Sequence, residues 1–452
     1  MALVIYPVSS SPSILHRNPN NLLLRNPNLL RFRCRKDRRR DQAPFMAASS
    51  DRPPKSTKLV TFLGKGGSGK TTSALLAAQY YAKLGLHTCL VIHSQDPTAE
   101  YLMGCKIGTS PTVFSDNLSA VRLETTKMLL EPLNRMKKAD ARLNLTQGVL
   151  QGVVGEELGV LPGMDSVLSV IEIEKLVGFR GGAASGRNNS QEKFDIIVYD
   201  GISSEETLRM IGAAERARWY LKYFRSIAEK TDLGRLTSPS LMKLADETLG
   251  FNGGFGTDVG TTAQIWDDVE GILEKTSAAF TEPLKFSCYL VMDPSNARSI
   301  TCALRYWGCA IQAGAQISGA FGFAPESCIQ SVEAAQKKIA PLPFALLPHF
   351  SMDSSVDWNA TLKVLGKSAQ SLLSTAGNCC QSSVKFNHAQ KSVTLFMPGF
   401  DKSEIKLFQY RGGSELLVEA GDQRRVICLP PGIQGKVGGA KYSDRSLVIT
   451  LR

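Results

Sequence analysis

The sequence lacks several features that would define its class at once. It has no apolar run of about 18 residues, the length that predicts a membrane-spanning helix. Its ten cysteines include no C-x-x-C pair, which argues against a disulfide framework and against a zinc site of closely paired thiolates. Several cysteines lie in apolar segments, where this residue is usually a small core side chain. We therefore expect a reducing compartment with mostly free thiols.

Acidic residues are missing from the first 36 positions. Residues 1–49 hold nine Lys and Arg against two Asp, which accounts for most of the chain's net charge of +12. An Arg- and Ser-rich, acid-poor N-terminus is typical of an organelle transit peptide, and the alternative is a disordered basic arm for nucleic acid. Four prolines before position 28 would interrupt the helix of a mitochondrial presequence, which favours the chloroplast. The small remaining charge gives no case for nucleic-acid binding.

The 452 residues, 43% of them hydrophobic, are enough for several folded cores. We expect a transit peptide over 1–49, an α/β domain over 50–373, a linker over 374–383 and a β module over 384–452. Buried strands are predicted at 59–63, 88–93, 194–200, 288–292, 317–323 and 345–347, with helices at 71–84, 205–249 and 266–279. This alternation predicts a parallel sheet flanked by helices. Helical periodicity over about 125–180 predicts an α-helical insertion, and short runs at 391–396, 404–408, 415–418, 425–429 and 446–451 predict an all-β sandwich.

The most specific motif is a glycine-rich loop between the first strand and the first helix. It fits G-x-x-x-x-G-K-[ST], and its context is the one that a phosphate-binding loop requires. Glycines let backbone N–H groups approach phosphate oxygens at the positive end of the following helix. Lys70 can reach the β- and γ-phosphates, and the Thr71 hydroxyl can bind Mg²⁺. The predicted ATP ligands are Gly64, Lys65, Gly66, Gly67, Ser68, Gly69, Lys70, Thr71 and Thr72.

A second lysine, Lys65, directly follows the first glycine of the loop. This deviant form of the motif occurs together with SQDP at 94–97, LPGMD at 161–165, Asp200-Gly201 and ETLR at 206–209. Over roughly residues 58–366 the chain resembles the arsenical-pump-driving ATPase family. That family includes the ATPases that guide tail-anchored membrane proteins to their destination.

The resemblance implies roles for individual residues. Lys65 would reach across a homodimer interface to the partner's nucleotide, and Asp96 would orient the attacking water. Asp200 would hold Mg²⁺ through water, and its place at the carboxyl end of a parallel strand agrees independently. Pro348 would flank the adenine. The alternative for Asp96 is a turn-forming residue before a proline, and for Pro348 a simple turn after a strand. Asp195, at the opposite end of its strand, is interpreted as structural.

Two further segments bear on function. The apolar positions of 128–154 could line a groove for hydrophobic clients, although such a stripe is more often ordinary core. The segment Pro398-Gly399-Phe400, followed by Glu404-Ile405 and a final apolar strand, resembles the α-crystallin domain of small heat-shock proteins. That resemblance implies protein–protein contact or holdase behaviour, and the alternative is a docking or stabilising sandwich.

The sequence therefore predicts a Mg²⁺-dependent ATPase whose nucleotide-driven homodimer handles hydrophobic client proteins or membrane-protein segments. Its expected location is the chloroplast, in the stroma or in peripheral contact with a plastid membrane, with no nucleic-acid partner. One alternative is a nucleotide-stabilised interaction protein without significant turnover. Another is an electron-transfer ATPase that resembles the nitrogenase iron protein, but no cysteine for a bridging cluster lies between Asp200 and Phe286. An arsenite-pump partner is disfavoured because no suitable cysteine triad is present.

Overall fold

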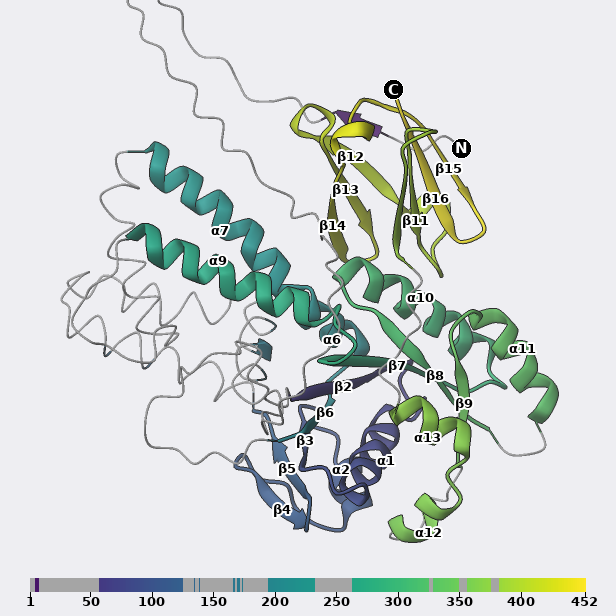
Figure 1. The fold of residues 1–452 in the computed structure, drawn as a ribbon. Helices are drawn as coiled ribbons and strands as arrows, with labels where there is room; N and C mark the ends of the chain where they lie inside the picture. The colour runs from purple at the N-terminus through teal and green to yellow at the C-terminus, as the bar shows by residue number, and fades with distance from the viewer. Residues whose placement is uncertain are drawn as a thin grey trace, which may run out of the picture.

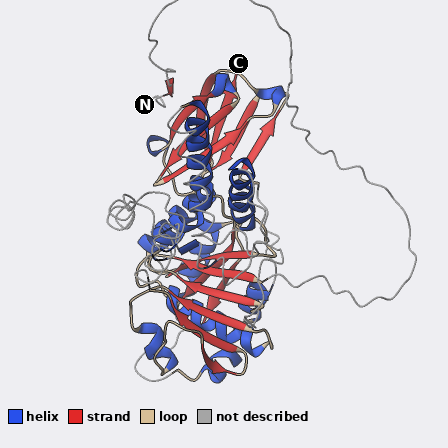
Figure 2. Ribbon diagram, turned by 90° about the vertical axis from the view of Figure 1, so that its left-hand side faces the viewer, coloured by secondary structure: helices blue, strands red, loops and turns tan. Residues whose placement is uncertain are grey.

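The computed structural model describes residues 5–7, 57–124, 194–231, 262–324, 328–348, 356–374 and 382–452, with six isolated helical positions between 134 and 173. These residues form an α/β part and a β-sandwich, with helix α10 (Ala297–Ala313) between them (Figures 1 and 2). No helix in these ranges is long and apolar enough to cross a membrane. The predicted insertion, including the proposed groove at 128–154, falls almost entirely outside the described residues.

Within these ranges, eight strands form one sheet in the order β4-β5-β3-β6-β2-β7-β8-β9. The strands are β2 (Lys58–Leu63), β3 (Thr88–Ile92), β4 (Thr112–Ser115), β5 (Leu118–Arg122), β6 (Ile196–Asp200), β7 (Phe286–Met292), β8 (Ile317–Phe323) and β9 (Phe344–Leu347). Only β4 pairs antiparallel with its neighbour in this sheet. The predicted parallel α/β sheet is thus confirmed. Strands β4 and β5 were not predicted: β4 is mostly exposed, and a serine interrupts the short apolar run of β5.

Helices cover both faces of the large sheet. One face packs against α1 (Lys70–Lys83), α2 (Thr98–Met103), α12 (Trp358–Lys363) and α13 (Lys367–Ser374). The other face packs against α6 (Ser204–Ile211), α10 and α11 (Ile329–Ile339). Helix α10 has clear end signals: the Asn296 side chain caps its first turn, and Gly314 ends it with a positive φ of 90°.

Helices α7 (Ala213–Lys230) and α9 (Thr262–Ala279) lie side by side and project from the α/β part (Figure 1). Ion pairs join them along their length. Arg218 lies 3.0 Å from Glu274, and Arg225 lies 2.6 Å from Asp267. Because these pairs are largely exposed, they select the alignment of the two helices more than they add stability.

The C-terminal part forms two sheets, in the orders β1-β12-β13-β14 and β10-β11-β16-β15. Their strands are β1 (Ile5–Pro7), β10 (Val384–Asn387), β11 (Ser392–Phe396), β12 (Lys406–Tyr410), β13 (Glu415–Ala420), β14 (Gln423–Cys428), β15 (Val437–Ser443) and β16 (Ser446–Leu451). The predicted sandwich is confirmed. Strands β10 and β15 were not predicted, since both are largely exposed and β15 contains two adjacent glycines. Strand β1, from the expected transit peptide, pairs parallel with β12.

The sandwich packs directly on α10. Trp307 meets Phe396 edge to face, with ring centroids 5.1 Å apart. The Arg305 guanidinium lies 4.6 Å from the centre of the Phe400 ring and donates hydrogen bonds of 2.7 and 2.8 Å to the Glu404 carboxylate. Aromatic packing and a two-point charged contact therefore hold the two parts together.

Two glycines allow the backbone of α10 and the backbone of the sandwich to approach each other closely at this interface. A Cβ on Gly308 would lie 2.2 Å from the carbonyl oxygen of Pro398. Gly399 has a φ of +72°, and a Cβ there would lie 2.4 Å from the backbone carbon of Leu304. The segment that resembles the α-crystallin pattern is thus the one that touches α10. The buried apolar residues of the sandwich and of the α10 face of the large sheet belong to one continuous core, and the α1 face has a core of its own.

Candidate active site

The glycine-rich loop connects β2 to α1, and two of its glycines are required by its geometry. Gly69, at the start of α1, has a φ of +93°, and a Cβ there would lie 2.5 Å from the Phe323 ring. A Cβ on Gly64 would lie 2.3 Å from the backbone oxygen of Val291. Both positions therefore exclude larger residues, on conformational or steric grounds.

The outer side of the loop is open. A Cβ on Gly66 or Gly67 would meet nothing within 4 Å, and Lys65 is exposed. The Ser68 hydroxyl is buried and has no hydrogen-bond partner among the described residues. An open backbone loop at the N-terminus of a helix is the arrangement that accepts phosphate groups.

Asp200 ends β6, the strand beside β2, and only 3% of its surface is exposed. Burial raises the pKa of its carboxyl to about 6, although a hydrogen bond from Thr71 and the charge of Lys70 oppose this rise. Its Oδ2 atom is buried and has no partner in the described part of the chain. Burial lowers the pKa of Lys70, while Asp200 and Glu205 act in the opposite direction. The predicted Lys70, Thr71 and Asp200 are thus brought together.

Oxygen atoms of Thr71 and Asp200 form a donor set that fits Mg²⁺, which binds few protein ligands and completes its shell with phosphate oxygens and water. The unpartnered Oδ2 of Asp200 is the observation that supports this fit. No group of three or more His, Cys, Asp or Glu suited to a metal occurs within the described residues. A site that shares its metal with a nucleotide does not need such a group.

Ser204, the first residue of α6, is a site residue that the sequence analysis missed. The Gly64 N–H donates to the Ser204 hydroxyl at 2.8 Å, and this hydroxyl donates to the Gly64 carbonyl at 2.8 Å. Ser203 caps α6 by accepting from the N–H of Glu206 at 3.1 Å. The spacing of Ser203 and Glu206 is a helix-start signal that could have located this helix but not its contact with Gly64.

Asp96 lies at the same edge of the sheet, and its charge contributes to the raised pKa of Asp200. Its own carboxylate is exposed and accepts hydrogen bonds from the Thr98 N–H at 2.8 Å and the Thr98 hydroxyl at 2.5 Å. These bonds lower the pKa of Asp96. The structure thus gives Asp96 the turn-forming contacts of the structural alternative, and its role toward water stays a prediction.

Thr72 and Pro348 are the remaining residues that were predicted to bind the nucleotide. Thr72 is buried within α1 and packs toward the core, with 4% of its surface exposed. Pro348 directly follows β9 and is half-buried, but residues 325–327 and 349–355 lie outside the described ranges. Its contact with adenine therefore stays a prediction.

Comparison with known proteins agrees with this geometry. Residues 57–306 match the model of the anion-transporting ATPase family, and residues 388–451 match an HSP20-like domain found in ArsA. The chain is 24% identical over 409 residues to a protein named as an arsenical pump-driving ATPase from Chlorobaculum tepidum, which covers 87% of this chain and 95% of the relative.

Shorter matches extend to eukaryotic ATPases. The ATPase GET3 of Zygosaccharomyces rouxii is 28% identical over 244 residues, 51% of this chain and 62% of the relative. ATPase ASNA1 homolog 1 of Paramecium tetraurelia is 29% identical over 153 residues, 33% and 41% of the two chains. The first family model alone spans more than half of the chain. The protein therefore belongs to the anion-transporting ATPase family: it is a nucleotide-binding ATP hydrolase that carries the family's HSP20-like domain at its C-terminal end.

Proposed function

We propose that this protein is a Mg²⁺-dependent homodimeric ATPase of the plastid, in which nucleotide turnover controls the handling of hydrophobic client segments. The observation that carries the proposal is the bond between Ser204 and Gly64, because it ties the phosphate loop to α6. Helix α6 leads directly into α7, so the nucleotide site and the projecting helices share one continuous segment.

In this proposal the loop N–H groups and Lys70 bind the phosphates, and Thr71 and Asp200 hold the metal, Asp200 through water. Bound Mg²⁺ supplies positive charge that offsets the charge on the phosphates. Asp96 orients the attacking water, and Lys65 of the partner subunit contacts the same nucleotide. The exposure of Lys65 supports this last role, because an outward side chain can reach a second copy.

Helix α6 also connects the loop to the sandwich. The Tyr306 hydroxyl of α10 donates to Glu205 at 2.5 Å, and Arg209 lies 3.1 Å from Asp422 in the turn between β13 and β14. A shift of α6 with nucleotide state would therefore reach both α7 and the sandwich. This is the physical route by which we propose that hydrolysis changes client binding.

Client handling has support from exposed apolar groups near these helices. Tyr220 and Tyr223 of α7 are 61% and 64% exposed, and Ile202, just after β6, is 48% exposed. The apolar stripe over 128–154 adds candidate contacts. The role in guiding tail-anchored proteins, known for ATPases that this chain resembles, makes transmembrane segments the proposed client class.

Steady-state ATP turnover tests the enzymatic part. Asp96→Asn is expected to abolish turnover and to retain nucleotide binding, whereas Asp116→Asn, in the exposed turn between β4 and β5, should leave turnover unchanged. Normal turnover in Asp96→Asn would remove this carboxylate from the mechanism. A wild-type protein that binds ATP without turnover would instead favour the nucleotide-stabilised interaction protein.

Mixed dimers test the role of Lys65. Lys65→Ala and Asp96→Asn should each be inactive alone, but a mixed dimer would regain one complete site if the lysine acts on the partner's nucleotide. In that dimer, the Lys65→Ala subunit keeps its own Asp96 and receives Lys65 from its partner. The absence of rescue in dimers shown to exchange subunits would contradict action across the interface.

Two experiments test location and clients. A fluorescent protein fused after residues 1–60 should enter chloroplasts, and import into mitochondria would overturn the plastid assignment. Proteins captured from stroma with a slowly hydrolysed ATP analogue should be enriched in transmembrane segments, compared with captures by Lys70→Ala. Enrichment of soluble proteins alone would argue for a general holdase.

A further inference from the structure

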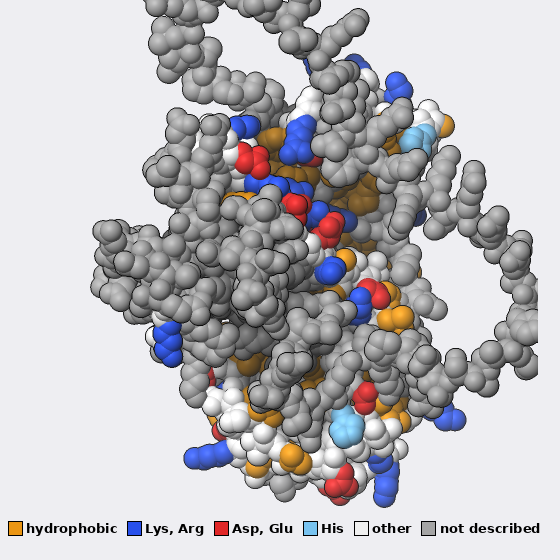
Figure 3. Space-filling model, turned by 60° about the vertical axis from the view of Figure 1, so that its left-hand side comes forward, with side chains coloured by type: hydrophobic (Ala, Val, Ile, Leu, Met, Phe, Trp, Pro, Cys, Tyr) orange, Lys and Arg blue, Asp and Glu red, His pale blue; other side chains and the backbone are white. Residues whose placement is uncertain are grey.

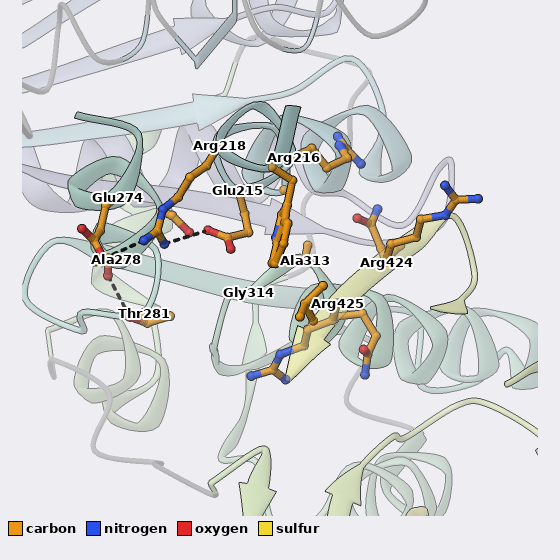
Figure 4. A pocket seen from close by; sticks show the side chains of 16 residues that line it. Glu215, Arg216, Arg218, Glu274, Ala278, Thr281, Ala313, Gly314, Arg424 and Arg425 are labelled. Atoms are coloured by element: carbon orange, nitrogen blue, oxygen red, sulfur yellow. Dashed lines mark hydrogen bonds and ion pairs between the residues drawn. The ribbon is translucent and has the colours of Figure 1, made fainter. Parts of the chain in front are cut away.

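A cleft of about 290 Å³ lies where α7, α9, the end of α10 and β14 meet (Figure 4). None of the residues predicted to bind nucleotide lines it. Its walls come from both the α/β part and the sandwich. Figure 3 shows basic and acidic side chains interspersed on one face of the molecule. The cleft is thus a separate feature at the junction of the two parts.

The acidic residues of the cleft already have partners. Arg218 lies 3.0 Å from Glu274 and 3.7 Å from Glu215, and these are the two carboxylates among the lining residues. The buried Nε atom of Arg218 lies 3.6 Å from Glu270, which also pairs with Lys222 at 3.2 Å. The charge of Arg218 is therefore already balanced by carboxylates.

Arg425 enters the cleft from β14, across from Arg218 (Figure 4). Both terminal nitrogens of Arg425 donate to one acceptor, the Ser383 hydroxyl, at 3.2 Å. In the described part of the chain no carboxylate pairs with this guanidinium. Burial lowers its pKa, yet an arginine stays protonated at neutral pH. A partly buried cation without an anion is costly unless a ligand supplies one.

Gln312, near the end of α10, is a second polar group without a full set of partners. Its side chain lines the cleft, only 4% of its surface is exposed, and its Oε1 atom has no partner in the described ranges. A terminal amide can turn either its donor or its acceptor toward a ligand. Gln312 and Arg425 therefore bring hydrogen-bonding groups without a full set of partners from α10 and β14 to one cleft.

We propose that this cleft binds a small anionic metabolite through a phosphate or carboxylate group held by Arg425 and the Gln312 amide. The Arg425 guanidinium is a cationic donor without a carboxylate partner among the described residues, which selects an oxyanion as the acceptor. The volume lies at the lower end of small-molecule sites, and this favours a compact molecule over a protein segment. Because the ligand would touch α10 and β14 together, its binding strengthens the contact between the α/β part and the sandwich. The site is independent of the proposed client function.

Calorimetric titration with inorganic phosphate and, separately, with citrate tests the site. The full chain is first saturated with Mg·ADP, so that the phosphate loop does not compete for the probe. We expect one of the probes to bind and Arg425→Gln to weaken it about tenfold or more, since a charge-assisted contact is lost. Gln312→Met, which keeps the shape of the side chain, should also weaken binding and serves if Arg425→Gln does not fold.

The matched control is Arg424→Gln, at the neighbouring position of β14, which also lines the cleft (Figure 4). Its guanidinium is exposed and already pairs with Glu419 at 2.5 Å. The control removes the same charge from a group that has an anionic partner, so only a small change is expected. Phosphate and citrate separate the two sources of the oxyanion. No binding of either probe to the wild-type protein, or equal weakening by Arg424→Gln and Arg425→Gln, would overturn the proposal.

Discussion

Asp200 offers a quantitative test of the electrostatics of the nucleotide site. Burial raises its pKa from 3.8 to about 6, so the folded protein binds this proton more tightly than the unfolded chain. The resulting stability is fully present below pH 3.8 and is lost as the pH rises through about 6. The two values differ by about two pH units, which corresponds to about 3 kcal/mol of unfolding free energy lost at neutral pH without ligands.

Asp200→Asn removes the charge and keeps the shape of the side chain. We expect the variant's unfolding free energy, relative to wild type, to rise by about 2 kcal/mol between pH 4 and pH 7.5. Urea unfolding of the nucleotide- and metal-free protein at a series of pH values measures this gap. Mg·ADP should reverse the order at pH 7.5, because the wild-type carboxylate gains a positive partner and the amide does not.

Asp195→Asn is the matched control, since Asp195 directly precedes the same strand and accepts from the His87 N–H at 3.1 Å in an exposed contact. The difference in unfolding free energy between Asp195→Asn and wild type should not show the rise expected for Asp200→Asn. The assignment of the lost stability to the buried carboxylate would be refuted by either of two results. One is an unfolding free energy of Asp200→Asn, relative to wild type, that does not change between pH 4 and pH 7.5. The other is an equal rise of this difference in Asp195→Asn.

Three further substitutions test the loop and the docked sandwich. Gly69→Ala should lower the unfolding free energy by about 1–3 kcal/mol and weaken ADP binding, because its positive φ and the Phe323 ring both oppose a Cβ; calorimetry that finds wild-type affinity would contradict this. Ser204→Ala should lower the unfolding free energy by about 1–3 kcal/mol, because it leaves the Gly64 N–H and carbonyl unpaired, and urea unfolding would detect the loss. Gly308→Val should separate the sandwich from α10 and change Trp307 fluorescence, whereas Gly271→Val in α9, where a Cβ would meet nothing within 4 Å, should not.

The features of the fold and site that could be predicted from the sequence are those determined by residues close together in the chain. The glycine loop is one example, because Gly69, which adopts a positive φ, and Lys70, which is predicted to bind the phosphates, are neighbours in the sequence. Asp200 is another, since a carboxylate at the end of a buried strand reaches the ligand edge of the sheet by the geometry of the strand alone. The order of strand, loop and helix was enough to predict the α/β architecture.

The parts that the sequence did not predict depend on distant partners. Ser204 acts through Gly64, 140 positions away, and no pattern around either residue announces that contact. The same holds for Trp307 and Phe396, whose rings meet only after the sandwich has docked. Asp96 illustrates a different limit, because one residue can both form a turn and face a substrate.

The continuous core across α10 means that the C-terminal sandwich is not a detachable module. Cutting the chain near residue 380 would leave the Trp307 face of α10 without its cover and would expose Phe396 and Phe400 on the other fragment. Each fragment would then present an apolar surface that the intact protein does not have, and apparent client binding by either one could be self-association. Assays of client binding with this protein therefore require the undivided chain with the sandwich docked on α10.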